Sequence, residues 1–218
     1  MIKRHPDSDL LVEYVSGSLS TAPGISVTTH LQFCDKCTRT VESLEEIGGS
    51  YLDEVETMQV SDDLLDKVLA CVDSDEPEPK PARETAVDDI TGALPGYVRR
   101  LLPEGKLRWR FLSPSLKVAP ISVGETTHEL ALHRIKAGGK APQHNHNGRE
   151  ITVVLTGSFS DEDGVYHPGD FLVREPGDTH QPNAAQHEEC ICLSVLDAPI
   201  RLTGLKKVFT PFVRFSPS

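Results

Sequence analysis

Apolar residues recur at helical spacing through the first 75 positions. A polar cluster at residues 7–9 precedes apolar positions 10, 11, 14, 15 and 19, which is typical of a capped amphipathic helix. A second helix is predicted from about residue 26 to residue 47, ending at Gly48 and Gly49. A third is predicted over residues 64–72 after a cap at 61–63. The apolar face of this last helix must be covered by the same module or by a bound partner.

The pattern changes to short β-type runs from about residue 101 onward. These runs are rich in β-branched and aromatic residues and are separated by Gly, Pro and Asp turn signals. No helical pattern lies between them, so they predict a β-sandwich or barrel. The predicted strands are 106–111, 129–135, 151–155, 171–174, 190–196 and 200–202.

A segment rich in proline and charge separates the two patterns. Residues 73–82 hold few apolar side chains and cannot bury enough surface to fold, so they predict an extended linker. The expected organisation is a small helical bundle at 1–75, a linker at 76–92 and a β domain at 93–218. The fold class is therefore an α + β multidomain chain.

The excess negative charge is concentrated in the helical part. The chain of 218 residues has a formal net charge of −11. Five Lys/Arg and fifteen Asp/Glu fall within residues 1–75, a net charge of −10, which leaves 17 basic and 18 acidic side chains in residues 76–218. Such a surface repels nucleic acid and attracts a basic protein partner, or it serves only solubility. Direct binding to nucleic acid is not expected.

The chain shows no membrane or export signal. No stretch approaches the roughly 18 apolar residues of a membrane span, and the first residues turn acidic at once instead of forming a signal peptide. We therefore expect a cytoplasmic protein. In a reducing compartment its five cysteines act as metal ligands, reactive thiols or buried apolar groups more often than as disulfides.

The stretch HLQFCDKC at 30–37 carries three soft-metal ligands. On a helix His30, Cys34 and Cys37 would share one face, because they are four and three positions apart. An imidazole and two thiolates suit tetrahedral zinc, with one ligand missing.

The missing fourth ligand has three candidates in the sequence. His5 is the first choice because a short loop before the first helix can bring it over the other three ligands. Asp35 and Cys71 are the alternatives.

The motif has a known counterpart. His5-Pro6 followed by His-x3-Cys-x2-Cys in a small helical module resembles the zinc-containing anti-sigma domain. Members of that family bind a group IV, or extracytoplasmic-function (ECF), sigma factor and block its access to RNA polymerase. The resemblance implies that His5, His30, Cys34 and Cys37 bind zinc. It also fits the acidic balance, because sigma factors present basic surfaces.

A second cluster lies in the β domain. His144 and His146 are two apart and Glu150 has the same parity, so on a strand all three face one side, and His180 comes from another strand edge. Three imidazoles and a carboxylate suit zinc or another divalent metal. Together with Gly138 and Gly157, this spacing is similar to the first motif of the cupin family, which implies a cupin β-barrel. The second cupin motif is matched only in part.

The order of the two motifs resembles the ChrR-type anti-sigma factors across the whole chain. The resemblance implies an anti-sigma factor with no enzymatic activity, whose cupin senses (photo)oxidative stress such as singlet oxygen or organic peroxides. The alternative is a dioxygenase-like cupin metalloenzyme with an accessory zinc domain.

Several residues and properties are left open by the sequence. Cys190 and Cys192 share a strand face and are either a redox pair or two ordinary buried thiols. His133 is assigned no role, nor are the other histidines outside the two clusters. The oligomeric state is not specified.

Overall fold

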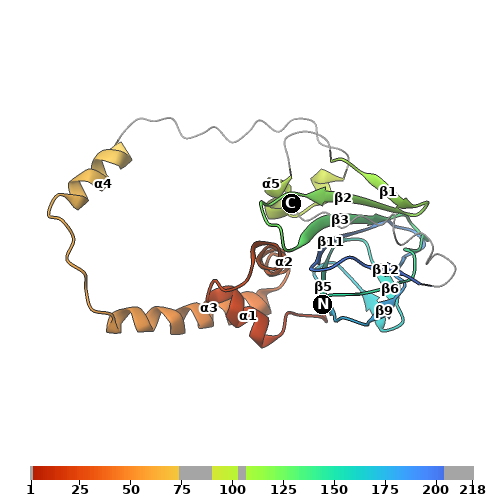
Figure 1. Ribbon diagram of the computed structural model, residues 1–218, viewed down its shortest axis with the longest axis horizontal. Helices are drawn as coiled ribbons and strands as arrows, with labels where there is room; N and C mark the ends of the chain where they lie inside the picture. The colour runs from red at the N-terminus through yellow and green to blue at the C-terminus, as the bar shows by residue number, and fades with distance from the viewer. Residues whose placement is uncertain (1, 74–89, 103–106, 204–218) are drawn as a thin grey trace.

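The computed structural model describes residues 2–73, 90–102 and 107–203 (Figure 1). The predicted linker at 76–92 lies outside the described residues up to residue 89. The helices are α1 (Ser8–Val15), α2 (Thr21–Leu31), α3 (Asp35–Ser50), α4 (Leu64–Asp73) and α5 (Gly96–Leu101), with 3-10 turns at Tyr51–Glu54 and Thr91–Ala93. The strands are β1 (Arg110–Ser113), β2 (Leu116–Ile121), β3 (Glu129–Ile135), β4 (His144–Asn145), β5 (Glu150–Thr156), β6 (Phe159–Asp161), β7 (Gly164–Tyr166), β8 (Phe171–Arg174), β9 (Thr179–His180), β10 (Asn183–Ala184), β11 (Cys190–Leu196) and β12 (Arg201–Leu202).

The first helix of the helical module (residues 2–54), α1, begins with the predicted cap. The Asp7 side chain accepts a hydrogen bond from the Leu10 backbone N–H at 2.8 Å, so it satisfies one of the free amides that begin α1. The prediction of one helix over residues 26–47 is wrong, because that region forms α2 and α3. The backbone of Cys34 is extended, with φ −126° and ψ 92°, and this conformation breaks the run of helical hydrogen bonds between the two helices.

Helix α4 matches the third predicted helix but leaves its apolar face exposed. Figure 1 shows it apart from the helical module and the β strands. Leu65 is 66% exposed, Leu69 50% and Val72 74%, which is unusual for a stripe of this kind. Among the described residues no helix combines the length and the apolarity needed to cross a bilayer.

The β domain (residues 107–203) consists of antiparallel sheets. Its largest sheet has six strands in the order β1-β2-β3-β11-β5-β8, and two three-stranded sheets have the orders β10-β6-β7 and β12-β4-β9. The runs predicted at 129–135, 171–174 and 190–196 coincide with β3, β8 and β11. In the run predicted at 106–111, the described residues 107–109 are not in a strand, and β1 begins at residue 110.

The six-stranded sheet is covered on both faces. Helix α2 packs on β5 and β11, and Ile151 and Val195 from these strands share one core with Leu10 and Ile25 of the helical module. The opposite face of the same strands points into the β domain, where Cys192 joins a second core. Because side chains alternate along a strand, β5 and β11 serve both cores at once. Every residue of β11 is buried.

The shared core predicts a large effect for Leu193→Ala. Leu193 is fully buried in β11 in the core that joins the helical module to the β domain. Its truncation should lower the free energy of unfolding by about 2–5 kcal/mol, measured by urea denaturation of the whole chain. The same change at Leu65, which is 66% exposed, should cost no more than about 0.5 kcal/mol. Equal midpoints for the two variants would contradict this core assignment.

Candidate metal centres

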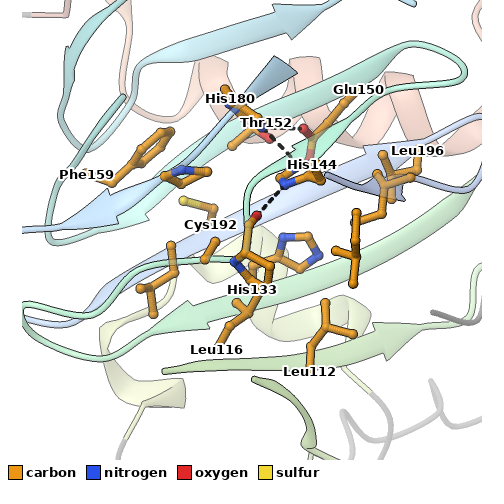
Figure 2. Close-up of a pocket in the computed structure, with 16 residues that line it drawn as sticks. Leu112, Leu116, His133, His144, Glu150, Thr152, Phe159, His180, Cys192 and Leu196 are labelled. Atoms are coloured by element: carbon orange, nitrogen blue, oxygen red, sulfur yellow. Dashed lines mark hydrogen bonds and ion pairs between the residues drawn. The ribbon is translucent and has the colours of Figure 1, made fainter. Parts of the chain in front are cut away.

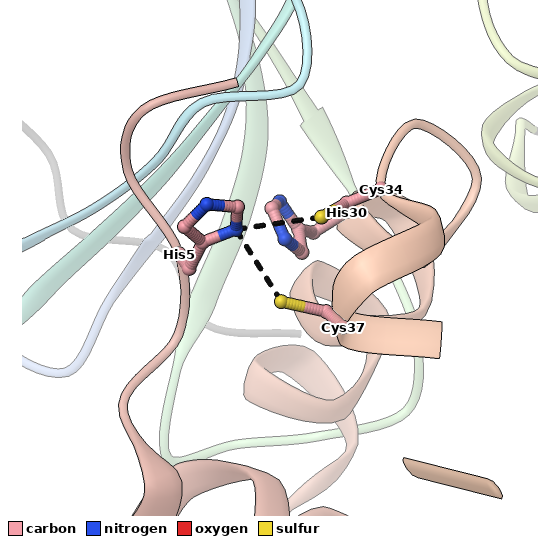
Figure 3. Close-up of side chains that lie close together, drawn as sticks. All are labelled: His5, His30, Cys34 and Cys37. Atoms are coloured by element: carbon pink, nitrogen blue, oxygen red, sulfur yellow. Dashed lines mark hydrogen bonds between the residues drawn. The ribbon is translucent and has the colours of Figure 1, made fainter. Parts of the chain in front are cut away.

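The first cluster joins three segments of the helical module (Figure 3). His5 precedes α1, His30 lies in the last turn of α2, Cys34 caps α3 and Cys37 lies in its first turn. The ligating atoms of these four residues lie within 4.8 Å of one another. His5 Nδ1 lies 3.4 Å from each of the two sulfur atoms. His30, Cys34 and Cys37, which a single helix was expected to carry, thus come from two consecutive helices, and His5 comes from the preceding loop, as expected.

The surroundings of His30 fit a metal ligand. Its side chain is fully buried, and its Nδ1 donates to the Gly169 carbonyl oxygen at 2.7 Å, because a carbonyl can only accept. A neutral imidazole that donates from Nδ1 has a lone pair on Nε2. This Nε2 atom is buried and has no hydrogen-bond partner among the described residues. A metal ion between His30, His5 and the two sulfur atoms would satisfy it.

Burial keeps the Cys37 thiol protonated when no cation is present. Desolvation and the neighbouring Cys34 sulfur raise the pKa of Cys37 to about 11. Burial also lowers the pKa of His30, so the imidazole is neutral near pH 7. A divalent ion would displace the thiol protons and offset the cost of two close thiolates.

The alternative fourth ligands lie elsewhere. Asp35 is exposed in the first turn of α3, and Cys71 is exposed on α4. Neither belongs to the four-residue cluster that the structure brings together.

The second cluster lies inside the β domain. His144 in β4 pairs directly with His180 in β9, while Glu150 begins β5 and His146 follows β4. The Nε2 atoms of His144 and His180 lie 3.0 Å apart, and those of His146 and His180 lie 3.2 Å apart. Glu150 Oε2 lies 3.3 Å from His146 Nε2. Two ligand atoms about 2.0–2.1 Å from one metal are about 3.0–3.4 Å apart, so these spacings fit a single ion.

Supporting hydrogen bonds orient the ligands of this second cluster. His144 Nδ1 donates to the Pro142 carbonyl at 2.9 Å, which leaves Nε2 free to face the cluster. His180 Nδ1 lies 3.2 Å from Asp161 Oδ2, and Ser194 Oγ donates to Glu150 Oε1 at 2.5 Å. Asp161 and Ser194 were not predicted from the sequence, because their roles depend on which strands become neighbours.

The charge of the second cluster suits a cation. Burial lowers the pKa of His144 to about 4 and also lowers the pKa of His146. Burial alone would raise the pKa of Glu150, but the surrounding imidazoles outweigh it and hold this pKa at about 2. Near pH 7 the cluster therefore presents an ionised carboxylate to a divalent ion, together with imidazole ligands that burial keeps neutral at His144 and His146.

A cavity opens onto the second cluster (Figure 2). His144, Glu150 and His180 line one part of it, and most of its other residues are apolar. His133, to which no role was assigned, also lines the cavity, and burial lowers its pKa. A small molecule can thus reach this cluster through an apolar environment. The apolar lining residues are Leu112, Leu116, Ile135, Ala141, Pro142, Phe159, Pro182, Leu196, Ile200 and Leu202.

The two strand cysteines lie beside this cavity. Cys190 and Cys192 are buried, with their sulfur atoms 3.6 Å apart, and Cys192 lines the cavity. The hydrogen bond with Cys190, together with burial, raises the pKa of Cys192 well above its usual value. A thiol held in its protonated form is a poor nucleophile, so the surroundings favour buried thiols over a redox pair.

Comparison with known proteins finds a matching family model, and a relative and a solved structure that are similar to this chain over most of its length. Residues 99–198 match the model of the ChrR cupin-like domain. The chain is 35% identical over 214 residues to the anti-sigma-E factor ChrR of Cereibacter sphaeroides, covering 98% of this chain and 99% of that protein. The structure is similar to that of Rhodobacter sphaeroides SigE in complex with the anti-sigma ChrR, with a TM-score of 0.75 and 30% identity, covering 90% of this chain and all of that one. The predicted helical and cupin architecture is confirmed.

The first cluster predicts that Cys37→Ser weakens the helical module. Loss of one sulfur ligand should remove its metal and lower the helical signal, because closed Cys/His sites stabilise small helical modules directly. Far-ultraviolet circular dichroism of the whole chain, with and without chelator, measures this effect. Cys71→Ser, at the exposed cysteine of α4, should behave as wild type. Full helicity of Cys37→Ser in chelator, equal to that of metal-loaded wild type, would contradict a structural metal.

Proposed function

The chain belongs to the family of ChrR anti-sigma factors, and from this premise we propose how its two metal clusters divide the work. The protein is an anti-sigma factor, a regulator rather than an enzyme, and its partner is a group IV (ECF) sigma factor. In our proposal the helical module and α4 bind the sigma factor, and the cupin domain senses the signal that releases it. We also propose that the chain acts in the cytoplasm.

One observation carries the proposal, namely that the two clusters differ in ligand chemistry and in access. His5, His30, Cys34 and Cys37 form a closed set that suits tetrahedral zinc in a structural role. The His3Glu cluster (His144, His146, Glu150 and His180) borders a cavity instead and contains no thiolate. We propose zinc at the first site and zinc or another divalent metal at the second.

The surface of the N-terminal part supports sigma binding. Residues 1–75 carry a net charge of −10, which complements a basic partner and disfavours direct contact with DNA. Leu65, Leu69 and Val72 expose the apolar face of α4. An exposed apolar helix face rimmed by acidic residues is typical of a surface that becomes buried when a protein partner binds.

The cupin cluster supports the sensing role. When bound, a divalent ion supplies a Lewis-acidic centre for an oxygen atom of a small molecule. Asp161 and Ser194 orient the ligands of this cluster, and the apolar wall of the cavity excludes water. We propose that this site responds to singlet oxygen or to organic peroxides.

The binding surface is tested with Leu69→Asp on α4. A charge on this exposed apolar face should weaken inhibition of the sigma factor at least about tenfold, because it must be buried against the partner. Transcription by RNA polymerase carrying the sigma factor, titrated with purified chain, measures the loss. Val165→Asp, at an exposed valine of β7, should inhibit as wild type does. Unchanged inhibition by Leu69→Asp would remove α4 from the interface.

The sensing role is tested with His144→Ala. Loss of this buried ligand should leave inhibition of the sigma factor intact but blunt its release after illumination with a photosensitiser, read from a sigma-dependent reporter. His187→Ala changes an exposed histidine outside both clusters and should respond normally. A normal response of His144→Ala would show that the cupin cluster is not the sensor.

A further inference from the structure

The same four-residue turn, X-Pro-Gly-Asp, occurs at both ends of β8. His167–Asp170 precedes the strand and Glu175–Asp178 follows it. In each turn an aspartate Oδ2 atom accepts the backbone N–H of the first residue at 2.9 Å. The aspartate N–H donates back to the carbonyl of that residue, at 2.9 Å in one turn and 3.0 Å in the other. The two turns are thus alike in local structure and differ in what they contact.

The first turn holds the segment that carries His5. Asp170 is only 1% exposed, and its second oxygen, Oδ1, accepts the backbone N–H groups of Lys3 at 2.7 Å and Arg4 at 3.0 Å. The Phe171 N–H donates to the Arg4 carbonyl at 3.1 Å. The residues immediately before His5 are therefore fixed to the start of β8 by these three hydrogen bonds. The two that the Asp170 carboxylate accepts are of the stronger, charge-assisted kind.

The same turn orients His30. The Gly169 carbonyl accepts the proton of His30 Nδ1 and thereby directs Nε2 toward the first cluster. The Phe171 ring also lies edge-on to the His30 ring, with centroids 5.7 Å apart. A Cβ atom on Gly169 would lie 2.7 Å from atoms of Ile2 and Phe33, so the helical module packs directly against this backbone.

The second turn faces the other cluster. Asp178 is exposed, and a Cβ atom on Gly177 would meet nothing within 4 Å. The Gly177 backbone donates to the His146 carbonyl at 2.9 Å and accepts from the Asn145 side chain at 2.7 Å. One strand of four residues, about 13 Å long, therefore carries a supporting turn for each metal cluster.

We propose that the turn His167–Asp170 of the β domain is a positioning element for the metal site of the helical module. Gly169 orients His30, and Asp170 holds the His5 segment in reach of Cys34 and Cys37. The thiolate site is thus completed by docking of the helical module on the β domain, and β8 links it to the cupin cluster. The inference rests on the proposed zinc site and adds residues that bind no metal themselves.

Asp170→Asn in the zinc-loaded full chain tests this role. An asparagine keeps the shape of the side chain but has only one acceptor oxygen. It cannot accept both from the His167 N–H and from the N–H groups of Lys3 and Arg4, so the segment that carries His5 should be held less firmly. In excess chelator, N-ethylmaleimide should modify Cys34 and Cys37 about tenfold faster than in wild type, as followed by peptide mass spectrometry. Asp178→Asn, the same change in the matching turn, should leave this rate at the wild-type value.

Two further measurements distinguish a positioning role from a non-specific loss of structure. In a His5→Ala background, where labelling is already fast, Asp170→Asn should add nothing if it acts through His5. Gly169→Ala, which keeps the charge, should also speed labelling, whereas Gly177→Ala should not.

Three results would overturn the proposal. If Asp170→Asn is labelled at the wild-type rate while His5→Ala is labelled fast, the positioning role is rejected and the proposed zinc ligand set still stands. Slow labelling of His5→Ala would instead reject the proposed ligand set, and the positioning role with it. Faster labelling of the buried Cys190 and Cys192 in Asp170→Asn would show unfolding of the β domain rather than a local role.

Discussion

Alternation of side chains along β5 and β11 is the constraint on which the rest of the molecule depends. Ile151 and Val195 point outward into the core shared with the helical module, while Glu150 and Ser194 lie side by side at the cupin cluster. A shift of register by one residue would exchange these two sets and destroy both. The sheet is therefore one wall with a candidate metal cluster on each side, and this arrangement puts the proposed sensor and the proposed binding module in direct contact.

The two clusters differ in the way that their proposed roles require. A metal at the site with two buried sulfur ligands must displace a thiol proton, since burial holds the pKa of Cys37 near 11 without a cation, so metal binding at this site should strengthen as the pH rises. The cupin cluster is preorganised by hydrogen bonds to Pro142, Asp161 and Ser194 and stays open to a cavity. Strand β8 runs between their supporting turns, so in the proposed scheme it is the shortest link between the cupin cluster and the metal site of the helical module.

The sequence predicted what depends on local pattern. The strands β3, β8 and β11 were predicted correctly because short β-type runs bounded by turn signals are specific. The two candidate metal clusters were predicted from their spacing, and the structure brings the residues of each cluster together. The break between α2 and α3 was missed, because His30, Cys34 and Cys37 satisfy helical spacing whether or not the helix continues. Asp161, Ser194 and Asp170 act across strand pairs or between modules. Such contacts are set by tertiary register, which one sequence does not display.

In the proposed scheme one chain holds a sigma factor through a module built around one metal ion, while a second metal ion sits in the cupin sensor. Native mass spectrometry of the full chain, co-expressed with a group IV sigma factor from the same genome, tests both parts at once. We expect a complex of one chain with one sigma factor, carrying two divalent ions. A complex with a single ion would contradict the separate sensor site, and a chain with two ions that binds no sigma factor would contradict the proposed binding module.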